Sequence, residues 1–133
     1  MKNTTDLKDK ALMKILVVED NPTDMKLVST VLERAGHEVY DAVSAEQAVE
    51  ILQNAIPQVI ITDLDLPEMD GLTMTRQLKQ SPKTAGIPVI AVTSYPDNFL
   101  RRSALEAGVA AYFIKPLNTR TLSKQLAAVL NQA

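Results

Sequence analysis

The chain has 133 residues, of which 46% are hydrophobic and 23% charged, and these values suit one globular domain with an apolar core. It contains no cysteine, which excludes disulfides, thiol catalysis and cysteine-ligated metals, and no apolar run reaches the roughly 20 residues of a membrane-spanning helix. The net charge is −2 and no basic stripe is visible, so we expect no direct binding to nucleic acid.

The first residues have the composition of a leader rather than of a folded element. They mix lysines with aspartates and lack the apolar segment of a signal peptide, so we expect a cytoplasmic protein that does not bind membranes. Residues 1–13 are predicted to form a flexible N-terminal leader. Translation from Met13 is an alternative hypothesis to a start at Met1, and the folded domain is expected to span residues 14–131.

The first two strands and helices follow the leader. Residues 14–18 are a continuous aliphatic run, typical of a strand buried on both faces. A helix is expected from the Asn21 cap, which a proline follows, to the stop at Gly36. Residues 38–42 alternate apolar with polar side chains, as an edge strand does, and Ser44 begins a capping box before the second helix.

The same alternation continues to the end of the chain. Residues 58–62, 88–92 and 111–114 are short apolar runs that predict three more strands. Helices are expected over residues 71–80 and roughly 97–107. A last helix is indicated by apolar residues at i, i+4, i+7 and i+8, namely Leu122, Leu126, Val129 and Leu130.

Five βα units with short connections predict an α/β fold. Right-handed crossovers give an open, doubly wound parallel sheet with helices on both faces. For this length we expect the flavodoxin-like (βα)5 arrangement with strand order 2-1-3-4-5.

Polar residues stand where the predicted strands end, which is where open α/β sheets bind ligands. The first strand is followed by Glu19 and Asp20, the third by Asp63, the fourth by Thr93 and the fifth by Lys115. The first and third strands are neighbours in the expected order, so the three carboxylates converge. Like charges this close raise one another's pKa unless a cation lies among them, and oxygen-only ligands favour Mg²⁺. With a metal and Lys115 present, an aspartate is suited to accept a phosphoryl group.

The motifs at these strand ends resemble the receiver domain of two-component response regulators. The match runs in order through most of the chain and comprises Val17-Val18-Glu19-Asp20-Asn21, Asp63-Leu64-Asp65-Leu66-Pro67-Glu68-Met69-Asp70-Gly71, Val92-Thr93-Ser94 and Lys115-Pro116. The resemblance implies a signalling protein rather than an enzyme, with only its own phosphorylation and autodephosphorylation as chemistry.

The resemblance also implies roles for single residues. Asp63 would accept the phosphoryl group from a sensor histidine kinase or a histidine phosphotransfer protein. Glu19, Asp20 and Asp63 would hold Mg²⁺, together with the backbone carbonyl of Asp65. Lys115 would bind a phosphoryl oxygen, and its bond to Pro116 would be cis.

A switch is implied between Thr93 and Tyr112. Thr93 would bind the phosphoryl group, and Tyr112 would move inward as the threonine hydroxyl shifts. This movement would change a surface formed by the fourth helix, fifth strand and fifth helix, where a downstream protein docks. Asp65 and Tyr95 are expected to tune the lifetime of the phosphorylated state, and His37 is expected at the surface. A monomer or a weak dimer is expected.

Three alternatives stand beside this interpretation. A haloacid dehalogenase-like phosphatase shares the spacing of Asp63 and Asp65, but its motif normally follows the first strand, with Thr or Val where Pro67 stands here. A receiver-like protein-binding module would be expected to lack an acid, the acceptor or the lysine, and this chain has them all. The third alternative is a receiver domain excised from a hybrid histidine kinase or a longer regulator.

Overall fold

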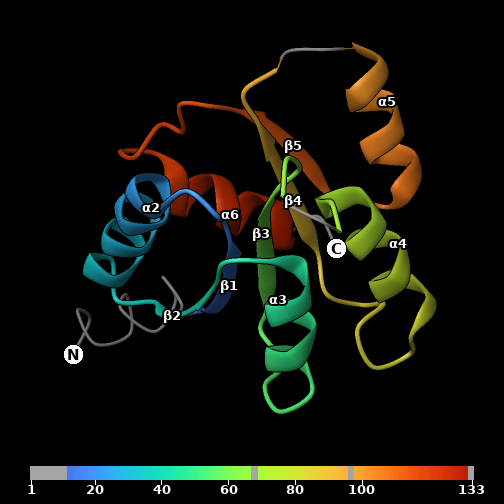
Figure 1. Ribbon diagram of the computed structural model, residues 1–133. Helices are drawn as coiled ribbons and strands as arrows, with labels where there is room; N and C mark the ends of the chain where they lie inside the picture. Colours follow the sequence, from blue (N-terminus) through green and yellow to red (C-terminus); the bar gives the residue numbers. More distant parts are fainter. Residues whose placement is uncertain (1–11, 67–68, 96–97, 132–133) are drawn as a thin grey trace.

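The computed structural model describes residues 12–66, 69–95 and 98–131, so the predicted leader before Leu12 and the loop residues Pro67 and Glu68 lie outside the described part. Five strands form one parallel sheet in the order β2-β1-β3-β4-β5, as predicted (Figure 1). The strands are β1 (Lys14–Val18), β2 (Glu38–Ala42), β3 (Val59–Asp63), β4 (Val89–Thr93) and β5 (Ala111–Ile114). The helices are α2 (Pro22–Arg34), α3 (Ala45–Leu52), α4 (Gly71–Gln80), α5 (Asn98–Ala107) and α6 (Leu122–Asn131).

Helices cover both faces of the sheet, as a parallel sheet requires. On one face, α2 and α6 bury Val28, Leu32, Leu122 and Leu126 against the central strands. On the other face, α3, α4 and α5 bury a second apolar cluster that includes Met74 and Leu78. Figure 1 shows the two groups of helices on opposite sides of the sheet. Among the described residues, no helix has the length and apolar character needed to cross a bilayer.

The helix starts follow the predicted capping signals. The side chain of Asn21 accepts a hydrogen bond from the backbone N–H of Asp24, with proline at the first turn of α2. Ser44 accepts from the N–H of Gln47, as the first half of a capping box, whereas the Gln47 side chain accepts from the N–H of Val43, one residue before the cap. Local hydrogen bonds of this kind are visible in sequence because both partners lie within one turn.

Two strands are shifted by one residue relative to the prediction. The strands β3 and β4 each begin and end one position later than the runs at 58–62 and 88–92. Asp63 is paired in register with Val92, and the N–H of Lys115 donates to the carbonyl of Thr93. Backbone pairing continues through these polar residues because the parallel ladder does not depend on side-chain polarity.

The prediction that His37 lies at the surface is wrong. His37 is only 6% exposed, and its Nδ1 accepts a hydrogen bond of 3.0 Å from the backbone N–H of Met13. Its Nε2 lies 3.4 Å from the hydroxyl of Ser123 in α6. The register of β2 against β1 pairs Lys14 with Glu38, which places the preceding residues Met13 and His37 side by side beneath α6. Met13 is itself buried, at the end of the stretch predicted as leader.

Candidate functional site

Three carboxylates meet at the carboxyl ends of β1 and β3. The pairing of Val18 with Thr62 brings the next residues of each strand, Glu19 and Asp63, to the same edge of the sheet. Glu19, Asp20 and Asp63 offer oxygen atoms that all lie within 4.8 Å of one another. Glu19 and Asp63 are buried, whereas Asp20 is exposed to solvent. Three hard oxygen donors at this spacing, one of them open to water, fit a divalent cation such as Mg²⁺.

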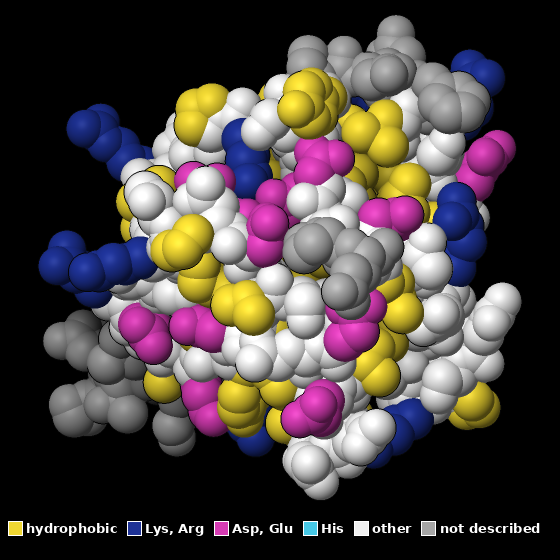
Figure 2. All heavy atoms as spheres, viewed as in Figure 1, with side chains coloured by type: hydrophobic (Ala, Val, Ile, Leu, Met, Phe, Trp, Pro, Cys, Tyr) yellow, Lys and Arg dark blue, Asp and Glu magenta, His cyan; other side chains and the backbone are white. Residues whose placement is uncertain are grey.

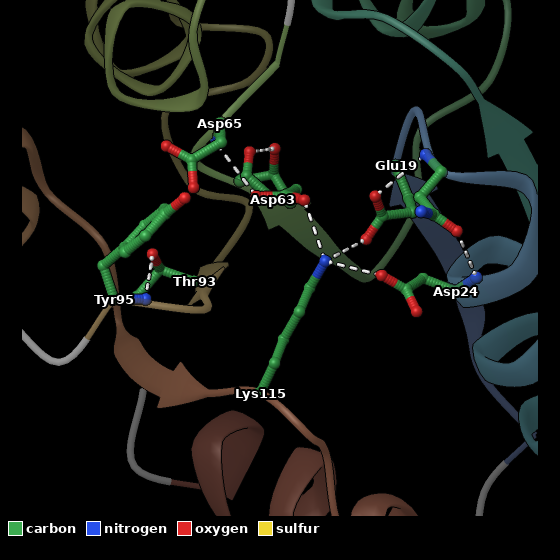
Figure 3. Close-up of polar contacts among 9 residues, drawn as sticks. Glu19, Asp24, Asp63, Asp65, Thr93, Tyr95 and Lys115 are labelled. Atoms are coloured by element: carbon green, nitrogen blue, oxygen red, sulfur yellow. Dashed lines mark hydrogen bonds and ion pairs between the residues drawn. The ribbon is translucent and has the colours of Figure 1, made fainter.

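Lys115 reaches this cluster from the far side of β4. Its ammonium nitrogen lies 2.8 Å from Oε1 of Glu19, 2.9 Å from Oδ2 of Asp63 and 3.0 Å from Oδ2 of Asp24 (Figure 3). The Lys115–Pro116 peptide bond is cis, as predicted. Asp24, in the first turn of α2, was not predicted to belong to the site, because only the tertiary structure brings this turn to the end of β5.

The electrostatics of the cluster leave it short of positive charge. Burial raises the pKa of the Glu19 carboxyl, and the negative charge of Asp63 raises it as well. Hydrogen bonds from Lys115 and from the backbone N–H of Asn21 act in the opposite direction. Burial disfavours the charged form of Lys115, but its hydrogen bonds to Glu19, Asp63 and Asp24 outweigh this and raise the pKa of the ammonium. One lysine therefore faces more carboxylates than it can neutralise, which is the condition under which a cation binds.

Asp63 is held in one orientation by both of its oxygens. Oδ1 accepts a hydrogen bond of 2.9 Å from the backbone N–H of Asp65, and Oδ2 accepts from Lys115. Leu64 and Leu66 are buried and anchor the loop, so the Asp65 side chain between them is exposed. Burial, followed by the charge of Asp63, raises the pKa of the Asp65 carboxyl. A fixed carboxylate at the edge of a cleft is positioned to act as a nucleophile.

A chain of hydrogen bonds connects Thr93 with Tyr112 through the backbone of Tyr95. The Thr93 hydroxyl accepts from the N–H of Tyr95 at 3.1 Å, and the Tyr112 hydroxyl donates to the carbonyl of Tyr95 at 3.2 Å. Thr93 is fully buried, whereas Tyr95 is 62% exposed and its ring points toward Asp65 (Figure 3). The two residues predicted to form the switch are thus connected through one intervening residue.

The site opens onto the surface beside Lys115. A cleft of about 350 Å³ is lined by Glu19, Asp24, Asp63 and Lys115 and, on its apolar side, by Leu27 and Leu117. In Figure 2, acidic side chains gather over the carboxyl ends of the central strands. The carboxylates of the cluster therefore line a cleft that opens to solvent.

Comparison with known proteins identifies the family. The family model described as the response regulator receiver domain matches residues 15–127. The chain belongs to the response regulator receiver domain family. It is a signalling protein of the phosphorylation-switched type rather than a conventional enzyme. Family membership and strand order together set aside the haloacid dehalogenase alternative, in which the motif follows the first strand.

Relatives of this receiver domain cover most of its length. Protein PilH of Pseudomonas aeruginosa is 34% identical over 119 residues, 90% of this chain and 98% of PilH. Chemotaxis protein CheY1 of Helicobacter pylori is 35% identical over 122 residues, 89% of this chain and 97% of CheY1. Among solved structures, this chain is similar to the receiver domain of sensor histidine kinase PA1611 from Pseudomonas aeruginosa, with 29% identity and a TM-score of 0.83. The match covers 91% of this chain and 99% of the PA1611 domain, whose structure has a magnesium ion coordinated in the active-site cleft.

Proposed function

We propose that this receiver domain is switched by phosphorylation of Asp63, with the phosphoryl group supplied by the phosphohistidine of a sensor histidine kinase or of a histidine phosphotransfer protein. The observation that carries the proposal is the position of Asp63, a buried carboxylate that is fixed by Lys115 and the Asp65 N–H and that lines the cleft beside Glu19. As a regulated signalling protein it needs only this self-modification and its reversal, and the proposed location is the cytoplasm.

The proposed reaction is a phosphoryl transfer in which the protein mainly positions groups and balances charge. A bond forms between a carboxylate oxygen of Asp63 and the phosphorus, and the bond between the phosphorus and the donor imidazole nitrogen breaks. The ammonium of Lys115 balances the charge of a phosphoryl oxygen. Glu19, Asp20, Asp63 and the carbonyl of Asp65 are the proposed ligands of Mg²⁺, which supplies the remaining positive charge when bound.

The proposed response starts at Thr93. The Thr93 hydroxyl now accepts a hydrogen bond from the Tyr95 N–H, and a phosphoryl group on Asp63 would offer an anionic acceptor to which this hydroxyl can donate. Since the carbonyl of Tyr95 accepts from Tyr112, movement of this segment alters the position of Tyr112 on β5. The proposed docking surface for a downstream protein is formed by α5, β5 and α6, where Leu105 and Ile114 are half exposed. The proposed oligomeric state is a monomer or a weak dimer.

The test is phosphorylation of the purified protein by a small phosphodonor in the presence of Mg²⁺, followed by intact mass measurement. We expect one added phosphoryl group that depends on Mg²⁺ and is absent from Asp63→Asn. Asp65→Asn is the matched control, because it removes an exposed carboxylate two residues away and should still be phosphorylated. Phosphorylation of Asp63→Asn would overturn the proposal. So would a wild-type protein that neither gains a phosphoryl group nor releases phosphate.

A further inference from the structure

Two sets of carboxylates overlap at the site without being identical. The candidate metal ligands are Glu19, Asp20 and Asp63, whereas the partners of Lys115 are Glu19, Asp24 and Asp63. Glu19 and Asp63 belong to both sets. Asp24 is the one carboxylate partner of Lys115 that is not in the metal cluster.

An ammonium group has three N–H donors, and the three carboxylates account for all of them. Glu19 and Asp63 must divide their negative charge between Lys115 and a metal when one is bound. Phosphorylation then places a new group on Asp63 itself. Of the three interactions of Lys115, only the one with Asp24 involves neither a candidate metal ligand nor the residue that is phosphorylated.

We propose that Asp24 is a positioning residue that holds the Lys115 ammonium beside Asp63 when the metal and the phosphoryl group occupy the other two carboxylates; this inference rests on the proposed function. Figure 3 shows Lys115 extending from β5 across the site, with Asp24 approaching its end from α2. A lysine side chain has four flexible bonds, and a second anchor beyond the reacting carboxylate reduces the freedom that must be lost on reaction.

The position of Asp24 suits an anchor that stays in place. Its backbone N–H donates to the Asn21 side chain, and it stands in the first turn of α2 directly before Met25, which is buried. Its side chain is 40% exposed, so its charge needs no metal to be tolerated. The neighbouring Asp20 differs, because no ion pair to Lys115 within 4.0 Å is found for it among the described residues.

A second effect of an acid in this turn is the favourable interaction with the helix dipole. Glu46 of α3 provides the control, because it is the first-turn acid of another helix on the opposite face of the sheet. If Asp24 acted only through helix stability, Asp24→Asn and Glu46→Gln would have the same small effect on the rate of Asp63 phosphorylation. A positioning role predicts an effect for Asp24→Asn alone, and only while Lys115 is present.

The first experiment measures the rate of Asp63 phosphorylation by a small phosphodonor at saturating Mg²⁺. We expect Asp24→Asn to be slower by about three- to tenfold, as for loss of one orienting contact. Glu46→Gln should keep the wild-type rate, and Asp24→Glu should recover part of it. An unchanged or faster rate in Asp24→Asn would overturn the inference, as would an equal loss when Asp24→Asn is added to Lys115→Ala.

The second experiment needs no phosphorylation. The side-chain NMR signal of the Lys115 ammonium, assigned by its loss in Lys115→Ala, is recorded with Mg²⁺ bound. We expect slow hydrogen exchange in the wild type and fast exchange in Asp24→Asn, whereas equal exchange would contradict the anchor. If the wild type accepts no phosphoryl group but this signal depends on Asp24, the proposed function fails and the anchoring of Lys115 stands.

Discussion

At the scale of single residues, the acidic cluster is arranged for binding a cation at the expense of stability without one. Glu19 and Asp63 are buried and share Lys115, whereas Asp20 adds a third carboxylate within 4.8 Å of them. In the absence of a cation, the repulsion among these groups opposes folding. Residues selected for a charged site commonly have this effect on stability.

We therefore predict that Asp20→Asn raises the free energy of unfolding in the absence of divalent cations. The expected gain is about 1 kcal/mol, the size of one interaction between unit charges about 4 Å apart in water. With Mg²⁺ the wild type should become the more stable of the two proteins, because it gains free energy of unfolding from the bound cation and the variant gains less. Urea unfolding with and without Mg²⁺ measures both values.

Glu33→Gln is the control for this prediction, since Glu33 is an exposed acid at the far end of α2. It should show neither the gain without Mg²⁺ nor the loss of the Mg²⁺ response. If Asp20→Asn were no more stable than the wild type without cations, the proposed repulsion within the cluster would be contradicted.

At the scale of elements, the start of α4 packs directly against the backbone of Asp63. The helix is capped by Asp70, whose side chain accepts from the N–H of Thr73 at 2.8 Å. Its first residue, Gly71, packs directly on the strand end: a Cβ atom there would lie 2.5 Å from the carbonyl oxygen of Asp63 and 3.2 Å from Cα of Leu64. Only a residue without a side chain allows this approach.

Gly71→Ala is predicted to destabilise the protein by about 1–3 kcal/mol, the usual cost of forcing an added methyl group into packed atoms. Because the displaced atoms belong to Asp63 and its neighbour, we also expect slower phosphorylation. Thermal unfolding and the phosphorylation rate are the two measurements. Gly86→Ala is the matched control, since nothing lies within 4 Å of its Cβ position, and it should be neutral in both. Equal effects of the two substitutions would contradict the close-packing argument.

At the scale of the whole molecule, His37 connects the starts of β1 and β2 with α6. Nδ1 must be unprotonated to accept from the Met13 N–H, so the folded protein requires the neutral ring. Burial lowers the pKa of His37 below its ordinary value of 6.5. The unfolded chain then binds a proton more readily than the folded one.

Stability from His37 is therefore fully present above about pH 6.5, the unfolded value, and is lost as the pH falls from there toward the lower folded value. We predict that the free energy of unfolding decreases between pH 7.5 and 5.5. His37→Asn retains an acceptor near the position of Nδ1 but does not titrate, so its stability should change less over this range. Denaturant unfolding at the two pH values makes the comparison, and equal pH dependence in both proteins would contradict it.

The sequence by itself determined the order of elements, the fold class and most of the site. The local signals are apolar runs, helix caps such as Asn21 and Ser44, and polar residues at strand ends. Because the carboxyl ends of parallel strands meet at one edge of the sheet, these signals also predict that Glu19, Asp63 and Lys115 lie together. The tertiary structure alone decided the rest. Asp24 reaches Lys115, and His37 is buried against Met13 and Ser123, because of contacts between segments far apart in the chain. The local sequence around Asp24 or His37 does not predict these contacts, because the contacts depend on how the helices pack against the sheet.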